Sequence, residues 1–252
     1  MDLAIETRSL SRRFGDQTAV DAIDLAVPRG SFYGFLGPNG AGKSTTIKCL
    51  TGLLKPSAGE MKILGLDPRN DEMKVKHLIG VVPEEEALYQ RLTAAETLRF
   101  VGDVHGLDPA TIAARSDELC ELLELPPDGK LVADYSHGMK KKLQFAVALL
   151  GSPRLLFLDE PFEGVDAVAS RQVKDLLNGF VSRGGTVFLT SHVLEIVERS
   201  ATDVGILHRG RLVAQAPLAE LCAAAGGGTL EDVFIRLVGK EDIDRPTLEW
   251  LG

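Results

Sequence analysis

The sequence lacks any apolar stretch that approaches the roughly 20 residues a helix needs to cross a bilayer. Its first segment, Met1–Glu6, has neither a basic start nor an apolar run, so we expect no signal peptide. Both absences predict a cytoplasmic protein, and any work that it does at a membrane would be done from the surface.

Cysteine is also scarce, because Cys49, Cys120 and Cys222 lie far apart and match no metal-ligand spacing. We expect reduced, mostly buried thiols and no disulfide. Basic residues are outnumbered, with 28 Lys and Arg against 36 Asp and Glu, which gives a net charge of −8. Proteins that bind nucleic-acid phosphates usually show the opposite balance, so we expect no nucleic-acid partner.

What remains, 44% hydrophobic and 25% charged residues over 252 positions, is typical of a globular protein with a sizeable core. Alternation at Leu3–Thr7 and Ala19–Val27 predicts an N-terminal antiparallel sheet. An apolar strand at Ser31–Leu36 ends in a glycine-rich turn, and a helix is predicted at Ser44–Leu53. Further strands are predicted at Glu60–Leu64 and Leu78–Val82.

The pattern changes to helix between Thr93 and Leu125. Apolar positions there define two helix faces, formed by Leu98, Val101 and His105 and by Leu119, Leu122 and Leu123. We interpret this stretch as a helical lobe inserted into an α/β core and closed by the helix that follows Gly138.

The second half returns to short strands that are apolar on both faces, as in a covered parallel sheet. They are predicted at Leu155–Leu158, Thr186–Thr190 and Val204–Leu207, and a final strand at Leu212–Ala216 forms a hairpin through Arg209 and Gly210. A glycine hinge at 226–228 precedes a short amphipathic helix, whose apolar residues are Leu230, Val233, Phe234 and Leu237.

The phosphate-binding pattern G-x-x-x-x-G-K-[ST] is matched at residues 37–45, between a predicted strand and a predicted helix. Such a loop directs backbone N–H groups at phosphate oxygens, and the helix N-terminus adds partial positive charge. Lys43 is predicted to reach the β- and γ-phosphates and Ser44 to bind Mg²⁺. The predicted nucleotide contacts are Gly37, Pro38, Asn39, Gly40, Ala41, Gly42, Lys43, Ser44 and Thr45.

Two carboxylates follow the apolar strand at Leu155–Leu158, at the sheet edge where ligands bind. Asp159 is suited to a metal, and Glu160 is placed to polarise an attacking water, a role typically contributing ~10²–10⁴ in rate. An acidic pair after a strand is by itself more often a helix N-cap; the upstream phosphate loop favours the catalytic interpretation.

A phosphate loop and a strand-end acidic pair occur in many P-loop enzymes, and four further segments narrow the resemblance to one family. Tyr135–Met139 occupies the place of a signature peptide, Glu163–Asp166 resembles a D-loop, Thr190–His192 a switch histidine, and Phe14–Gly15 an adenine-stacking aromatic. All the motifs appear along the chain in one family's order, and over about residues 3–216 the chain resembles the nucleotide-binding domains of ATP-binding-cassette (ABC) transporters, most closely those of bacterial type-two exporters.

The resemblance implies an α/β P-loop NTPase (RecA-like) core, with an N-terminal antiparallel β subdomain and an inserted helical subdomain. We expect an ATPase domain at 1–216, with its core at 1–92 and 152–216 and the helical subdomain at 93–151. A C-terminal helical extension is expected at 217–252.

The resemblance also implies Mg-ATP hydrolysis by a dimer in which Ser136 and Gly138 of one chain contact the γ-phosphate bound by the other. His137 and Met139 replace the family's usual glycine and glutamine. ATP should hold together a homodimer, or a heterodimer with a second ABC subunit. An integral-membrane subunit would be the partner, placing this chain on the inner face of the cell membrane.

Some assignments have simpler alternatives. His192 is implied to donate to the γ-phosphate, but a histidine at a strand end is usually a cap. Phe14 would be a core residue if it does not stack on adenine. Lys140–Lys142 form either a solvated face or a surface near the partner's phosphates.

The family usually has glutamine after the strand at 78–82, where this chain has Pro83 followed by Glu84, Glu85 and Glu86. Glu84 is predicted to reach the metal in its place. The alternative is an exposed acidic loop.

The leading hypothesis is the energising subunit of an exporter, and the alternative is a soluble ABC ATPase, for example of the iron–sulfur assembly, translation or DNA-repair type. A P-loop kinase or GTPase is disfavoured, because no guanine motif is present and Ser136–Gly138 and His192 would be unexplained. Retention of Glu160 and His192 argues against a nucleotide sensor that does not hydrolyse.

Overall fold

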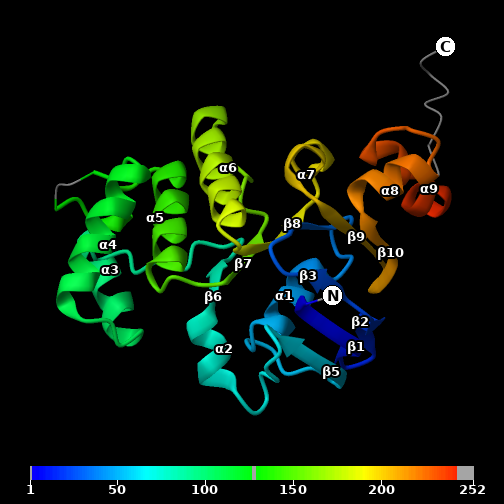
Figure 1. Cartoon of the computed structure of the whole chain (residues 1–252), viewed down its shortest axis with the longest axis horizontal. Coiled ribbons are helices and arrows are strands. Elements are labelled where there is room, and N and C mark those ends of the chain that lie inside the picture. The colour runs from blue at the N-terminus through cyan, green and yellow to red at the C-terminus, as the bar shows by residue number, and fades with distance from the viewer. Residues whose placement is uncertain (1, 127–128, 243–252) are drawn as a thin grey trace.

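A computed structural model of the chain describes residues 2–126 and 129–242, which form two sheets surrounded by helices (Figure 1). Residues 243–252 of the predicted C-terminal extension lie outside the described residues. In the described part, no helix is both long and apolar enough to cross a membrane.

The larger sheet has six strands in the order β10-β9-β4-β8-β7-β6. All neighbouring pairs are parallel except β9 and β10, which form the predicted hairpin. The parallel sheet predicted from the apolar runs is therefore confirmed. The strands are β4 (Phe32–Leu36), β6 (Ile79–Val82), β7 (Leu155–Asp159), β8 (Thr186–Ser191), β9 (Asp203–His208) and β10 (Arg211–Pro217).

The smaller sheet is antiparallel and is built on one long strand, β1 (Leu3–Phe14), which pairs with all its neighbours. The strand predicted at 19–27 is in fact two strands. The Thr7 hydroxyl separates them, because it donates to Ile23 O and accepts from Leu25 N, each at 2.8 Å. The partners of β1 are β2 (Gln17–Ile23), β3 (Ala26–Pro28) and β5 (Ala58–Ile63).

The helices cover both faces of the larger sheet and form the predicted helical lobe, at the left of Figure 1. Three short helices were not predicted: α2 (Glu72–Leu78), α7 (Leu194–Ser200) and α8 (Leu218–Ala224). Each has 7 residues, too few for a clear helical period. The others are α1 (Lys43–Leu50), α3 (Ala94–Val104), α4 (Pro109–Leu122), α5 (His137–Leu150), α6 (Ala167–Ser182) and α9 (Leu230–Asp242), with a 3₁₀ turn at Val132–Asp134.

Alternation along the buried strands divides the core into two clusters. Phe32 and Leu36 face the helices α5, α6, α7 and α9, whereas Tyr33 and Phe35 face α1 and the smaller sheet. The helical lobe joins the first cluster through Leu98 and Leu143. The larger sheet thus supports the helical lobe on one face and the N-terminal sheet on the other. The carboxyl ends of its parallel strands lie at the edge between these two parts.

Two of the predicted helix faces were wrong in detail. Leu122 is 55% exposed, because Leu119 and Leu123 share the buried face of α4 and Leu122 lies off that face. In α9, Leu237 is 42% exposed and Val238 is buried instead. The thiols are less buried than expected, since only Cys49 is fully buried; all three are free.

Helix α5 is fitted closely to β6 at Gly80. A Cβ at Gly80 would lie 2.3 Å from the backbone oxygen of Ala148, which a helix cannot accommodate without moving. We predict that Gly80→Ala lowers the free energy of unfolding by about 1–3 kcal/mol, as measured by urea titration. Gly129→Ala is the matched control, because a Cβ there meets nothing within 4 Å. Equal effects of the two substitutions would contradict this close fit.

Candidate active site

The phosphate-binding loop joins the end of β4 to the start of α1. Its glycines are required by the backbone: Gly40 and Gly42 have φ of +78° and +107°, in the region that favours glycine. A Cβ at Gly37 would lie 2.4 Å from Leu207 O, and one at Gly42 would lie 2.3 Å from Ala19 O. The loop is therefore fixed in shape by its neighbours, with the N-terminus of α1 at its end.

A cavity of about 670 Å³ lies over this loop. It is open to solvent, and its size suits a nucleotide. Among the predicted site residues that line it are Phe14, Pro38, Asn39, Gly40, Ala41, Gly42, Lys43, Ser44, Thr45, Glu84, Glu160 and His192. The structure thus brings together residues from five separate parts of the sequence in one cavity.

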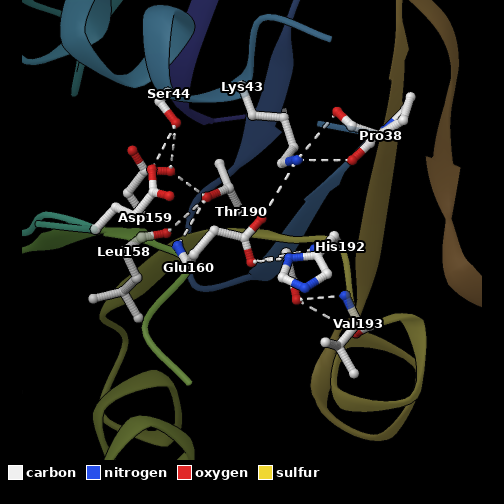
Figure 2. Close-up of polar contacts among 12 residues, drawn as sticks. Pro38, Lys43, Ser44, Leu158, Asp159, Glu160, Thr190, His192 and Val193 are labelled. Atoms are coloured by element: carbon white, nitrogen blue, oxygen red, sulfur yellow. Dashed lines mark hydrogen bonds and ion pairs between the residues drawn. The ribbon is translucent and has the colours of Figure 1, made fainter. Parts of the chain in front are cut away.

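Lys43 is buried at the base of the cavity. Its ammonium donates to Gly37 O at 2.7 Å and to Pro38 O at 3.4 Å, and it lies 3.4 Å from Glu160 Oε1 (Figure 2). A cation held by loop carbonyls at a helix N-terminus can bind anionic phosphate oxygens.

Oxygen donors gather on the other side of the cavity. Ser44 Oγ lies 3.2 Å from Asp159 Oδ1 and 3.5 Å from Glu84 Oε2. A hydroxyl and two carboxylates form a set of hard oxygen ligands that fits Mg²⁺. Within the described ranges no group of three or more His, Cys, Asp or Glu could hold a metal.

Glu160 occupies a strained position at the end of β7. Its φ is +45°, which a non-glycine residue rarely adopts and which is concentrated at functional sites. Its Oε2 accepts a hydrogen bond from the His192 backbone N–H at 3.2 Å and lies 3.0 Å from His192 Nδ1. Its Oε1 is buried and has no hydrogen-bond partner among the described residues. One carboxylate oxygen is therefore anchored, and the other can accept a proton from water.

Thr190 begins the segment that resembles a switch histidine, and the sequence predicts no role for it. Its hydroxyl donates to Asp159 Oδ1 at 2.6 Å and accepts from the Glu160 N–H at 3.1 Å. Thr190 lies directly opposite Asp159 in the pairing of β8 with β7. One buried hydroxyl therefore orients both acidic residues.

Phe14 is exposed at the rim and is not a core residue, so that alternative is wrong. Its ring is 45% exposed and lines the cavity, and the Arg12 guanidinium lies 4.5 Å from the ring centroid. Arg12 is itself held by Lys55 O at 2.8 Å. One face of the Phe14 ring is thus covered by a guanidinium that is itself held in place.

Ser136 and Gly138 are not brought to this cavity. Ser136 is exposed and caps helix α5, where its hydroxyl accepts from Met139 N at 3.3 Å. Helix α5 was predicted to follow Gly138, but it begins earlier, at His137, so Gly138 lies in its first turn. The signature segment and the phosphate loop of one chain are therefore separate surfaces.

The acidic and basic runs contact each other. Lys141 is buried and donates to Pro83 O and Glu84 O at 3.3 and 3.4 Å, so a solvated lysine face is wrong for this residue. Burial lowers the pKa of Lys141, and nearby carboxylates oppose that shift. Gln144 donates to Glu85 O at 3.0 Å. The loop that carries Glu84 is thus attached to helix α5 and is more than an exposed acidic loop.

A glycine-rich phosphate loop, a strand-end Asp-Glu pair and a mainly parallel sheet define a P-loop nucleotide hydrolase. A family profile described as "ABC transporter" matches residues 20–163. The chain belongs to this family, as an ATP-binding and ATP-hydrolysing subunit.

Two curated relatives and one solved structure cover most of the chain. The daunorubicin resistance ATP-binding protein DrrA3 of Streptomyces coeruleorubidus is 38% identical, covering 95% of this chain and 76% of that one. The bacitracin transport ATP-binding protein BcrA of Bacillus licheniformis is 37% identical, with 88% and 72% covered. A solved ATP-binding subunit of an ABC transporter has a TM-score of 0.87 at 31% identity, with 93% and 99% covered.

Thr190→Val removes the hydroxyl while keeping the side-chain shape. We predict that ATP turnover falls by about 10-fold, because Asp159 and Glu160 lose their common hydrogen-bond partner. Thr186→Val is the control on the same strand: it is equally buried, and its hydroxyl accepts from Gly30 N at 3.0 Å, away from the acidic pair. Steady-state ATPase rates measure the turnover of both variants. A similar loss of turnover in both would show that Thr190 has only a structural role.

Phe14→Ala tests the stacking platform. Base–aromatic stacking contributes ~1–3 kcal/mol, so ATP affinity should fall by roughly 5- to 150-fold while turnover at saturating ATP is largely kept. Phe100→Ala is the matched control, because Phe100 is also 45% exposed but lies on α3, outside the cavity. Equilibrium titration with ATP measures both variants; unchanged affinity for Phe14→Ala would exclude the platform.

Proposed function

We propose that this chain energises an exporter by closing and opening an ATP-dependent dimer on the inner face of the cell membrane. The proposal rests on one observation: the Ser136–Gly138 surface is separate from the cavity of its own chain. All the other nucleotide-binding groups lie in or beside that cavity, so a second chain is needed to supply the signature contact.

The relatives support the export direction. Their names refer to daunorubicin resistance and to bacitracin transport. A Nod factor export ATP-binding protein of Cupriavidus metallidurans is also 35% identical, with 93% of this chain and 78% of that one covered. These names favour an integral-membrane partner and do not support a soluble ABC ATPase of the iron–sulfur type.

Ser44, Asp159 and Glu84 would hold Mg²⁺, which when bound neutralises phosphate charge. Lys43 and the loop N–H groups bind the phosphates, and Phe14 stacks on adenine. Glu160 accepts the proton of the attacking water through Oε1, which faces Lys43 and accepts no hydrogen bond among the described residues, while His192 donates to the γ-phosphate. The hydrogen bond from the His192 N–H to Oε2 holds this carboxylate at the end of β7.

We also propose the domain boundaries given by the sequence: an ATPase domain at 1–216, with a helical subdomain at 93–151, and an extension at 217–252. The change from sheet to helix after β10 supports this division. The extension nevertheless packs on the ATPase domain, because Leu230, Val233 and Val238 belong to its larger core cluster. The dimer is either a homodimer or a heterodimer with a second ABC subunit.

Glu160→Gln keeps the side-chain shape and removes the base, so turnover should fall by about 10²-fold or more while ATP still binds. We predict that this variant is largely monomeric without nucleotide and dimerises when ATP is added. Analytical ultracentrifugation measures the change in dimer content.

Adding Ser136→Arg to the Glu160→Gln variant should abolish the dimer while ATP binding to the monomer is kept. A dimer indifferent to ATP and to Ser136 would contradict the proposal.

The transport role has its own test. A membrane protein encoded beside this chain should form a complex with it when the two are produced together and purified in detergent. The complex should hydrolyse ATP, and Glu160→Gln should abolish that hydrolysis without dissociating the two proteins. Failure of every neighbouring membrane protein to bind would favour a soluble ATPase.

A further inference from the structure

His137 lies in the signature segment, between Ser136 and Gly138, and contacts two other loops. Its Nδ1 is 3.1 Å from Glu86 Oε1, and its Nε2 is 3.2 Å from the backbone oxygen of Glu163. A Cβ at Gly164 would lie 3.0 Å from Nε2, so the ring lies close against that loop. One half-exposed side chain thus bridges three segments that are distant in sequence.

Each of these loops also carries a residue of the nucleotide site. Glu86 is two residues from Glu84, which approaches Ser44. Glu163 follows Glu160 by three residues and itself lines the cavity. The signature segment faces outward, as its exposed Ser136 shows. The His137 ring therefore connects the outward-facing surface of a chain with the metal side and the base side of that chain's own cavity.

Both partners of the ring are hydrogen-bond acceptors, so the number of N–H groups on the ring decides how many of them it can bind. A neutral imidazole has one N–H, so it can donate to only one of them, whereas the doubly protonated ring can donate to both. Lys140, at 2.9 Å from Glu86 Oε2, and then His137 hold the pKa of Glu86 below its ordinary value, so Glu86 stays a carboxylate.

Other charges face the same region. The D-loop contributes the Glu163 and Asp166 carboxylates, and Asp166 Oδ2 would lie 3.8 Å from a Cβ at Gly138. Helix α5 contributes Lys141, whose electrostatic partners include Glu163 and Glu86, and Lys142, which lies 3.5 Å from Glu124. The His137 ring thus lies between carboxylates on two loops and the lysines of its own helix.

We propose that His137 is a positioning residue that couples the two nucleotide sites of the dimer. By binding Glu86 and Glu163 O together, it fixes Ser136 and Gly138, which contact the partner's nucleotide, relative to the loops around the chain's own nucleotide. The inference rests on the proposed signature contact across the dimer. It gives a role to the His137 side chain, at a position where the family usually has glycine and therefore no side chain.

The first test uses ATP-dependent dimerisation of the Glu160→Gln chain. Adding His137→Ala should raise the ATP concentration needed for half-maximal dimer by about 3- to 10-fold, which corresponds to two partly exposed hydrogen bonds. ATP affinity of the monomer should not change. His137→Asn keeps one donor and should restore part of the effect. His77→Ala is the control, since His77 is an exposed histidine whose ring contacts Met73 O.

A double-mutant cycle identifies the contact. If His137 acts through Glu86, then Glu86→Ala and His137→Ala together should raise the half-maximal ATP concentration by less than the product of their separate effects. Independent, multiplicative effects would overturn the coupling through Glu86.

Rescue by His137→Asn is the readout that a merely structural role would not change. Equal effects of His137→Asn and His137→Ala on the half-maximal ATP concentration would overturn a role for the hydrogen bonds of the ring.

The outcomes separate the two proposals. If Glu160→Gln with His137 intact does not dimerise with ATP, the proposed function fails. If it dimerises and His137→Ala behaves like His77→Ala, the dimer mechanism stands and the role of His137 is overturned.

Discussion

The parallel pairing of β4, β7 and β8 is the constraint on which the site depends. Parallel strands end at the same edge of a sheet, and their register places Leu36 opposite Ser191 and Asp159 opposite Thr190. A slip of one residue would turn every side chain of a strand to the other face. The phosphate loop, the acidic pair and the switch histidine therefore meet because three apolar strands are held in a single register by the two core clusters.

The contiguous parts of this arrangement could be predicted from the sequence. The phosphate loop and the strand ending in Asp159 and Glu160 are local patterns, so their chemistry follows from residue type and spacing. The role of Thr190 could not be found this way, because it depends on a hydrogen bond between residues 31 positions apart. The register between β7 and β8 is a property of the folded sheet.

Charged runs were the least predictable feature. Lys140–Lys142 and Glu84–Glu86 both have the composition of solvated surface, yet Lys141 is buried under Pro83 and Glu84. Sequence alone shows that the runs have opposite charge, but not that they meet. Their pairing depends on the approach of helix α5 to the end of β6, which Gly80 permits. Short helices and single positions such as Leu122 were missed for the related reason that tertiary contacts decide them.

The backbone of Glu160 has a consequence for the stability of the turn that it forms. A non-glycine residue with φ of +45° costs on the order of 1 kcal/mol, and glycine or asparagine would reduce that cost. Glutamate at this position therefore lowers the stability of the turn and in return places a carboxylate at the edge of the sheet. In a chain that did not use this carboxylate, the backbone would favour glycine or asparagine here.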